Sequence, residues 1–381
     1  MQLAVTDWLA NPNPRVTCTI KLGAYTFTGH TQPRGHAHAE VMALREAAAQ
    51  GISVKGATAY VSLEPCSHFG RTPPCCHALI DAGIAKVVVA ILDPNPLVAG
   101  RGVQMLRAAG VQVEVLATDS AQAVASRELN IGFFSRMLRG VPWVRLKIAA
   151  SLDGVTALPN GASQWITGVG ARTDGHAWRA RSCAVLTGIG TVLQDDPLLD
   201  VRHMDTPRQP HVVVVDSQLE TPLNAKLFST LGKRPVQGEK FGLTQDVIDS
   251  IAGRALFIYA AVPNAAKKRA LEALGATVIY LPDASGAKVD LQAMVRDLGQ
   301  REINELHVEA GFKLNGSLLR AGVVDELLVY TAPKLLGAGM GMANLPELAQ
   351  LDGAVQLDFQ SADKVGEDLR IVARLRGRDQ F

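Results

Sequence analysis

The chain contains 381 residues, which exceeds what one hydrophobic core usually organises, so two domains are expected. With 48% hydrophobic and 19% charged residues, the composition excludes a disordered chain and indicates globular domains with full cores. The formal net charge of +2 and the lack of any run of five or more basic residues argue against binding nucleic acid or membrane through bulk electrostatics. Small-molecule chemistry is therefore favoured.

The cysteines and the N-terminal sequence bear on the cellular compartment. Five cysteines, an odd number with Cys75 and Cys76 adjacent, make a poor disulfide framework and suit a reducing compartment. Cys18 and Cys183 each lie in an apolar run and are expected to be buried core thiols. Because the sequence shows neither a leader pattern nor an uncharged apolar run of about 18 residues, we expect a cytoplasmic protein without membrane association.

Strand-like runs alternate with helix-like segments, which predicts an α/β architecture with a mainly parallel sheet in each half. In the first half, helical spacing with terminal prolines and glycines predicts helices at 39–50, 75–82, 103–109 and 121–139. The strands expected between them are 57–63, 86–92 and 111–116. A Gly-Val-Pro interruption at 140–142 precedes a strand at 143–150, so we place the domain boundary there, with domains 1–140 and 141–381.

The second half repeats the alternation of strands and helices. Apolar runs predict strands near 183–187, 211–215, 255–260, 276–281, 304–309 and 325–331. Residues 232–250 are expected to form an irregular excursion.

Two short motifs carry most of the chemical information. The first motif contains His38 and Glu40, two residues apart. In the second, Cys66 follows Pro65, and Cys75 follows two consecutive prolines. One histidine and two thiolates can bind Zn²⁺ at three points and leave a fourth position for water, whose pKa zinc lowers to about 7. Glu40 is the natural general acid and base beside such a site. Since residues two apart do not share a helix face, His38 is expected at a helix entrance.

Other interpretations of these residues remain open from the sequence. A lone His-x-Glu pair is nearly uninformative, and Cys66 and Cys75 could be ordinary buried thiols without metal. With His68 or His77 they could instead form a closed structural zinc site. Eight residues separate the cysteines, whereas zinc deaminases of cytosine or adenine have two. The longer segment contains His68 and Arg71, which are polar groups suited to contact a substrate.

Longer motifs extend these observations over nearly the whole chain. Segments 38–40, 58–76 and 93–102, taken together, closely resemble the deaminase domain of the bifunctional deaminase-reductases of riboflavin biosynthesis. The resemblance continues in the second half, through segments 147–154, 163–167, 191–197 and 216–217. It implies an N-terminal cytidine-deaminase-like α/β/α sandwich and a C-terminal dihydrofolate-reductase-like α/β domain.

The resemblance also implies two consecutive activities with the cofactors Zn²⁺ and NADPH. The first is hydrolytic removal of the 2-amino group of 2,5-diamino-6-(5-phosphoribosylamino)pyrimidin-4(3H)-one. The second is reduction of the ribosyl group of 5-amino-6-(5-phosphoribosylamino)uracil to ribityl. The expected partner is this phosphorylated pyrimidine, with no nucleic acid, and the chain is expected to form a homo-oligomer, either a dimer or a tetramer.

The reductase half contains no Gly-x-Gly-x-x-Gly loop, so its site residues rest on the resemblance. Cofactor contacts are implied for Ala149, Trp165, Thr191, Asp195, Ser217, Gly311, Phe312, Lys313, Leu314, Asn315, Gly316 and Ser317. Substrate contacts are implied for Ser163, Arg179, Leu199, Arg202 and Glu309, with the arginines suited to phosphate. Lys147 and Asp195 are candidates for polar groups near the reacting ribose. Thr17 and Glu220 depart from the family pattern, which commonly has glycine and arginine at these positions.

Two rival functions follow from the same residues. A zinc deaminase of a base in RNA would share the metal ligands, but it would need a basic surface and aromatic stacking platforms. The second domain could instead be a non-catalytic assembly module.

Overall fold

The computed structural model describes residues 5–67, 73–96, 98–232, 241, 243–251 and 253–381, and these form two compact units. The first unit comprises Met1–Gly140 and Gly238–Ile251, and the second comprises Val141–Gln237 and Ala252–Phe381. His68 and Arg71, which we expect to contact substrate, lie outside the described residues. No helix within the described part of the chain is long and apolar enough to cross a membrane.

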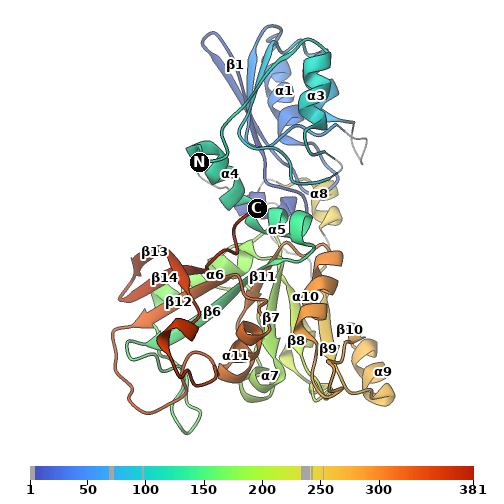
Figure 1. Ribbon diagram of the computed structural model, residues 1–381. Coiled ribbons are helices and arrows are strands. Elements are labelled where there is room, and N and C mark those ends of the chain that lie inside the picture. The colour runs from blue at the N-terminus through green and yellow to red at the C-terminus, as the bar shows by residue number, and fades with distance from the viewer. Residues whose placement is uncertain (1–4, 68–72, 97, 233–240, 242, 252) are drawn as a thin grey trace. The chain divides into compact units, whose positions relative to one another are not determined.

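The first unit is built on a five-stranded sheet with the strand order β2-β1-β3-β4-β5. Figure 1 shows this sheet with its strand β1 labelled. Strands β3, β4 and β5 are parallel to one another, whereas β1 is antiparallel to both β2 and β3. The strands are β1 (Thr17–Leu22), β2 (Tyr25–His30), β3 (Thr58–Val61), β4 (Lys86–Val89) and β5 (Gln112–Val115). The helices are α1 (Ala39–Ala49), α2 (Cys75–Asp81), α3 (Arg101–Ala108), α4 (Ala121–Leu129), α5 (Ile131–Arg139) and α8 (Gln245–Ser250), with a 3₁₀ helix at Val5–Ala10.

One core joins the sheet of this unit to its first three helices. Alanines of α1, Cys76 and Leu79 of α2, and Val103 and Leu106 of α3 pack with the buried residues of β1 to β4. The continuous helix expected over 121–139 is instead two helices that meet at Asn130. The Asn130 side chain accepts a hydrogen bond from the Arg15 backbone and donates to the Arg15 carbonyl, which favours a break in the helix at this residue.

The second unit contains a nine-stranded sheet with the order β10-β9-β8-β7-β11-β6-β12-β14-β13. The seven strands from β10 to β12 are parallel, and β14 and β13 continue the sheet as an antiparallel hairpin. The strands are β6 (Trp143–Ser151), β7 (Ala184–Gly188), β8 (His211–Val215), β9 (Leu256–Ala260), β10 (Ala276–Tyr280), β11 (Glu305–Val308), β12 (Glu326–Ala332), β13 (Leu357–Val365) and β14 (Asp368–Leu375). The helices are α6 (Val169–Arg181), α7 (Ile189–Asp195), α9 (Ala265–Ala273), α10 (Leu291–Gln300) and α11 (Phe312–Arg320), with 3₁₀ helices at Lys226–Thr230 and Leu351–Gly353.

The sheet topology determines where functional side chains can gather in each unit. The carboxyl ends of parallel strands meet at one edge of a sheet, where ligands bind in open α/β folds. In the first unit, the segment leading to Cys66 follows β3 and Asp93 follows β4. In the second unit, Glu309 directly follows β11. These edges are therefore the places to look for a site.

Candidate metal centre and reductase site

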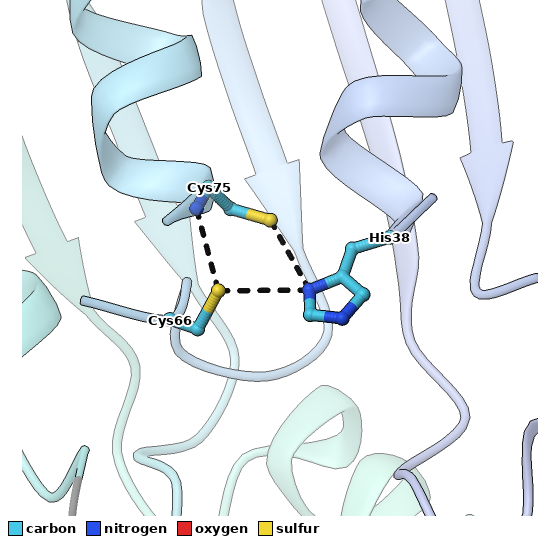
Figure 2. Close-up of side chains that lie close together, drawn as sticks. All are labelled: His38, Cys66 and Cys75. Atoms are coloured by element: carbon cyan, nitrogen blue, oxygen red, sulfur yellow. Dashed lines mark hydrogen bonds between the residues drawn. The ribbon is translucent and has the colours of Figure 1, made fainter. Parts of the chain in front are cut away.

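Three elements of the first unit bring His38, Cys66 and Cys75 together (Figure 2). His38 is the N-cap residue of α1, with extended backbone, and so lies at the helix entrance as expected. Cys75 is the first residue of α2, and Cys66 lies in the segment after β3. Nδ1 of His38 is 3.5 Å from Sγ of Cys66 and 3.3 Å from Sγ of Cys75.

These distances fit a tetrahedral zinc ion. Zinc binds sulfur at about 2.3 Å and nitrogen at about 2.0–2.1 Å, so tetrahedral neighbours of these types lie about 3.5 Å apart. All three ligand atoms lie within 4.8 Å of one another, and the group, drawn from the described residues, does not include His77. A site with one histidine and two cysteines has three protein ligands, which is typical of catalytic rather than closed structural zinc.

The surroundings of Cys66 stabilise its thiolate. Hydrogen bonds from the Cys75 thiol, the His38 ring and the Cys75 backbone N–H lower the pKa of Cys66 to about 4. The last of these bonds joins Cys75 N to Cys66 Sγ over 3.3 Å, at the N-terminus of α2. A thiolate that is stable at neutral pH is the form that binds metal.

Glu40 lies in the first turn of α1, and only 3% of its surface is exposed. Burial, together with the negative charge of Cys66, raises the pKa of the Glu40 carboxyl group to about 7. A carboxyl group with such a pKa can both take and return a proton near neutral pH. Its position beside the three ligands therefore suits a general acid and base.

A cavity of about 700 Å³ opens beside His38, between helices α1 and α2. His36, Met42, Arg45 and Pro74 contribute to its lining. This volume falls within the range of about 300–1,000 Å³ that small-molecule sites occupy.

In the second unit, Arg179 of α6 and Glu309 form a bidentate ion pair. Nε and Nη2 of Arg179 donate to the two carboxylate oxygens of Glu309, and Nη1 donates to the Asp200 carbonyl over 2.8 Å. Lys147 of β6 belongs to the same cluster: burial lowers its pKa, Glu309 opposes this shift and Arg179 adds to it. The structure thus brings together Lys147, Arg179 and Glu309. The Arg179 guanidinium group, however, binds the carboxylate of Glu309 rather than standing free for a substrate phosphate.

The remaining predicted reductase residues lie on several elements. Ala149 is two residues from Lys147 on β6 and shares its face of the sheet, while Thr191 and Asp195 are one helical turn apart on α7. Ser217 follows β8, Leu199 is buried, and Arg202 pairs with Asp200 at 2.7 Å. Ser163 and Trp165 lie between β6 and α6, and the residue Trp165 is 65% exposed.

Gly311 is the N-cap residue of α11, and Phe312, Lys313, Leu314, Asn315, Gly316 and Ser317 form the first turns of that helix. Asn315 donates a hydrogen bond to the Met342 carbonyl over 2.9 Å. A Cβ atom at Gly316 would lie 2.1 Å from the Asn344 carbonyl oxygen. At these two residues α11 packs closely against the 342–344 segment. The cofactor contacts that the family resemblance implies for this helix stay predictions.

Sequence reasoning missed two buried carboxyl groups near the metal centre. Glu64 accepts three backbone hydrogen bonds, and burial, together with the charge of Glu64, raises the pKa of Asp93 to about 7. Their positions in the sequence could have indicated them, because Glu64 lies two residues before the predicted ligand Cys66, and Asp93 follows the neighbouring strand β4.

Comparison with known proteins covers both units. The RibD C-terminal domain matches residues 142–371, and the cytidine and deoxycytidylate deaminase zinc-binding region matches residues 1–91. The riboflavin biosynthesis protein RibD of Escherichia coli strain K12 is 42% identical over 361 residues, which are 94% of this chain and 92% of that protein. The RibD protein of Haemophilus influenzae is 40% identical, over 97% of this chain and 94% of its own. The chain belongs to the RibD family.

Solved structures of the same family agree with this assignment. Acinetobacter baumannii RibD, form 1, is 36% identical with a TM-score of 0.80, covering 97% of this chain and 95% of its own. A diaminohydroxyphosphoribosylaminopyrimidine deaminase/5-amino-6-(5-phosphoribosylamino)uracil reductase of Thermotoga maritima is 25% identical with a TM-score of 0.78, covering 97% and 94%.

The membership confirms the expected fold class and the two enzymatic halves. The chain joins a cytidine-deaminase-like zinc-binding domain to a RibD reductase domain of the dihydrofolate-reductase type, and it is a bifunctional deaminase and reductase of riboflavin biosynthesis. The alternative with a non-catalytic C-terminal module is set aside, because residues 142–371 match the RibD C-terminal domain.

Proposed function

We propose that the chain deaminates 2,5-diamino-6-(5-phosphoribosylamino)pyrimidin-4(3H)-one and then reduces 5-amino-6-(5-phosphoribosylamino)uracil with NADPH. The observation that carries this proposal is the convergence of His38, Cys66 and Cys75 beside the buried acid Glu40. The Thermotoga maritima relative, a diaminohydroxyphosphoribosylaminopyrimidine deaminase and 5-amino-6-(5-phosphoribosylamino)uracil reductase, supports the choice of substrates.

In the deamination, His38, Cys66 and Cys75 would hold zinc, which when bound lowers the pKa of water and so supplies a nucleophile at neutral pH. Glu40 accepts the proton of the attacking water as its oxygen adds to C2 of the pyrimidine. The carboxyl group then returns this proton to the 2-amino nitrogen. The C–N bond breaks and ammonia leaves, while the second proton of the attacking water ends on the ring nitrogen next to C2 and C2 becomes a carbonyl carbon. One water is therefore consumed for each ammonia released.

In the reduction, NADPH supplies the hydride, and the protein aligns the reactants and stabilises charge. As C1 is reduced, its bond to the ring oxygen of the ribose breaks, and Lys147 supplies the proton that this oxygen takes up. Burial lowers the pKa of the Lys147 ammonium group, which favours release of that proton. Glu309 holds Arg179 and opposes this shift of the Lys147 pKa. Asp195, at the end of α7, is a second candidate for this role.

Metal removal tests the deaminase half of the proposal. The purified protein is expected to contain one zinc ion per chain and to release ammonia from the diaminopyrimidine phosphate. A chelator should abolish ammonia release without abolishing NADPH oxidation by the uracil phosphate, and added zinc should restore it. Ammonia release from RNA but not from the free pyrimidine would refute the proposed substrate.

We propose further that the chain forms a homo-oligomer through the second unit. Strand β13 is an edge of the nine-stranded sheet, and Phe359 on it is 75% exposed. The preceding residues Leu348, Leu351 and Val355 are 53%, 90% and 48% exposed, an apolar row that a second copy would cover. Light scattering after size exclusion tests this, since a monomer at micromolar concentration would contradict it.

We also propose that the protein works in the cytoplasm. Its five cysteines are free, and Cys66 and Cys75 must stay reduced to bind metal. Cell fractionation that found the enzyme in an oxidising compartment would contradict this proposal.

A further inference from the structure

The Glu64 side chain joins two separate segments of the deaminase unit. Its Oε2 atom accepts hydrogen bonds from the backbone N–H groups of Asp93, over 3.2 Å, and Gly100, over 2.8 Å. Its Oε1 atom accepts from Val103 N over 3.1 Å. Only 3% of the residue is exposed. A carboxylate this buried needs such bonds, so the site is built around its charge.

Helix α3 depends on this carboxylate at its N-terminus. Gly100 is the N-cap residue of α3 and provides no side-chain cap, while Val103 is the third residue of the helix. Glu64 therefore caps the helix from a distant part of the chain, at the end where backbone N–H groups are unpaired and negative charge is favoured. The same carboxylate fixes the position of Asp93, after β4, through its backbone N–H group.

Helix α3 is in direct contact with the segment that contains the predicted metal ligand Cys66. A Cβ atom at Gly102 would lie 2.1 Å from the Pro65 carbonyl oxygen, so the backbone of α3 touches the residue before Cys66. The Cys76 thiol of α2 donates to the same Pro65 carbonyl over 3.3 Å and to the Gly102 carbonyl over 3.5 Å. Pro65 is thus held between α2 and α3.

We propose that Glu64 is a positioning residue of the metal centre. Because it binds the backbone of Asp93 and the N-terminus of α3, Glu64 holds both beside residues 64–66. It thereby fixes the place of the Cys66 thiolate relative to His38 and Cys75. Nothing in this role requires Glu64 to touch metal or substrate. The inference rests on the proposed function only in that the centre binds zinc.

The test compares the full-length protein with the variants Glu64→Gln and Glu64→Asp. Glutamine has the same shape but replaces one acceptor oxygen by an NH₂ group that faces backbone N–H groups, so at least one of the three bonds is lost. Aspartate keeps the charge and both oxygens. Glu114→Gln is the matched control, because Glu114 is a half-exposed carboxylate of the same unit, paired with Lys86 at 2.7 Å.

Zinc affinity by chelator competition and the absorption spectrum of the cobalt(II)-loaded protein are the main readouts, with KM and kcat of deamination and reductase activity measured alongside. Glu64→Gln is expected to bind zinc about 10- to 100-fold more weakly, the usual effect of changing an outer partner of a metal site. Its cobalt spectrum should change, kcat of deamination should fall more than KM rises, and reductase activity should be unchanged. Glu64→Asp should recover part of the affinity.

Wild-type zinc affinity and an unchanged cobalt spectrum in Glu64→Gln would overturn the inference, even if the variant melted at a lower temperature. If the deaminase unit of Glu64→Gln does not fold, Glu64→Asp decides: weaker zinc binding in the folded aspartate variant supports positioning, and wild-type affinity overturns it. Failure of the wild-type protein to bind zinc would refute the proposed deaminase and this inference together.

Discussion

Replacing Glu40 by glutamine separates proton transfer from metal binding. The variant keeps the shape of the side chain but can neither take a proton from water nor return one to ammonia. Because the buried carboxylate lies beside the Cys66 thiolate, removing its charge also relieves a repulsion. Glu40→Gln should therefore retain zinc while deamination falls by about 10²- to 10⁴-fold, the usual contribution of general acid-base catalysis.

The raised pKa of Glu40 also determines how the stability of the metal-free protein depends on pH. In the metal-free protein its pKa shifts from 4.5 to about 7. Such a shift of about 2.5 units corresponds to about 3 kcal/mol, since one unit is about 1.4 kcal/mol. Because the folded pKa lies above the unfolded one, this stability is present below pH 4.5 and lost as the pH rises through 7. Metal-free Glu40→Gln should thus be more stable than wild type at pH 8, by up to about 3 kcal/mol.

Zinc content, ammonia release and calorimetry of the chelated protein test these expectations. The calorimetric transition that zinc addition shifts belongs to the deaminase unit, and NADPH oxidation by the uracil phosphate reports on the other unit. A Glu40→Gln protein that keeps zinc and full deaminase activity would refute the assignment of Glu40. Equal stability of the two metal-free proteins at pH 8 would refute the reasoning about burial.

Three further outcomes follow from the geometry. Cys66→Ser should lose zinc and deaminase activity but keep reductase activity, and full zinc content by atomic absorption would contradict the ligand set. Glu309→Gln should lower reductase kcat/KM. It should also lower the pH above which reduction slows, because the pKa of Lys147 falls further without the Glu309 charge. An unchanged pH profile would exclude Lys147 as the acid. Burial lowers the pKa of His211 to about 4, and its Nδ1 atom accepts a hydrogen bond from Ala255 N, so the folded protein favours the neutral ring. As the pH falls from 6.5 to 4, the wild type should therefore lose about 2–3 kcal/mol more free energy of unfolding than His211→Asn. Equal losses in urea titrations would contradict this.

Segments with strong periodicity were predictable from the sequence, and segments held by tertiary contacts were not. The helix over 39–50 and the parallel strands of the second half were expected, and α1, β7 and β8 lie where expected. The hairpins β1–β2 and β13–β14 were missed. Strand β13 is largely exposed and mostly polar, so it lacks the apolar run that identifies a buried strand. Helix 121–139 is broken by a bond to Arg15, more than 100 residues away in sequence.

The metal ligands could be proposed from the sequence because the chemistry restricts them to few residue types in short motifs. The structure added their mutual distances. The position of Glu64 before Pro65-Cys66 marked it as a neighbour of the site, but its role could not be predicted. That role comes from three backbone partners about 30 to 40 residues further along the chain. The cluster of Lys147, Arg179 and Glu309 likewise depends on the order of strands in the sheet, which pattern alone does not determine.

The order of the two reactions tests the central claim most directly. Purified protein is incubated with the diaminopyrimidine phosphate, with and without NADPH, while ammonia and cofactor absorbance are followed separately. Ammonia should appear at the same rate without NADPH, and NADPH should be oxidised only after ammonia has been released. Oxidation of NADPH before any ammonia appears, or ammonia release that requires NADPH, would contradict a zinc-dependent deamination followed by an independent reduction.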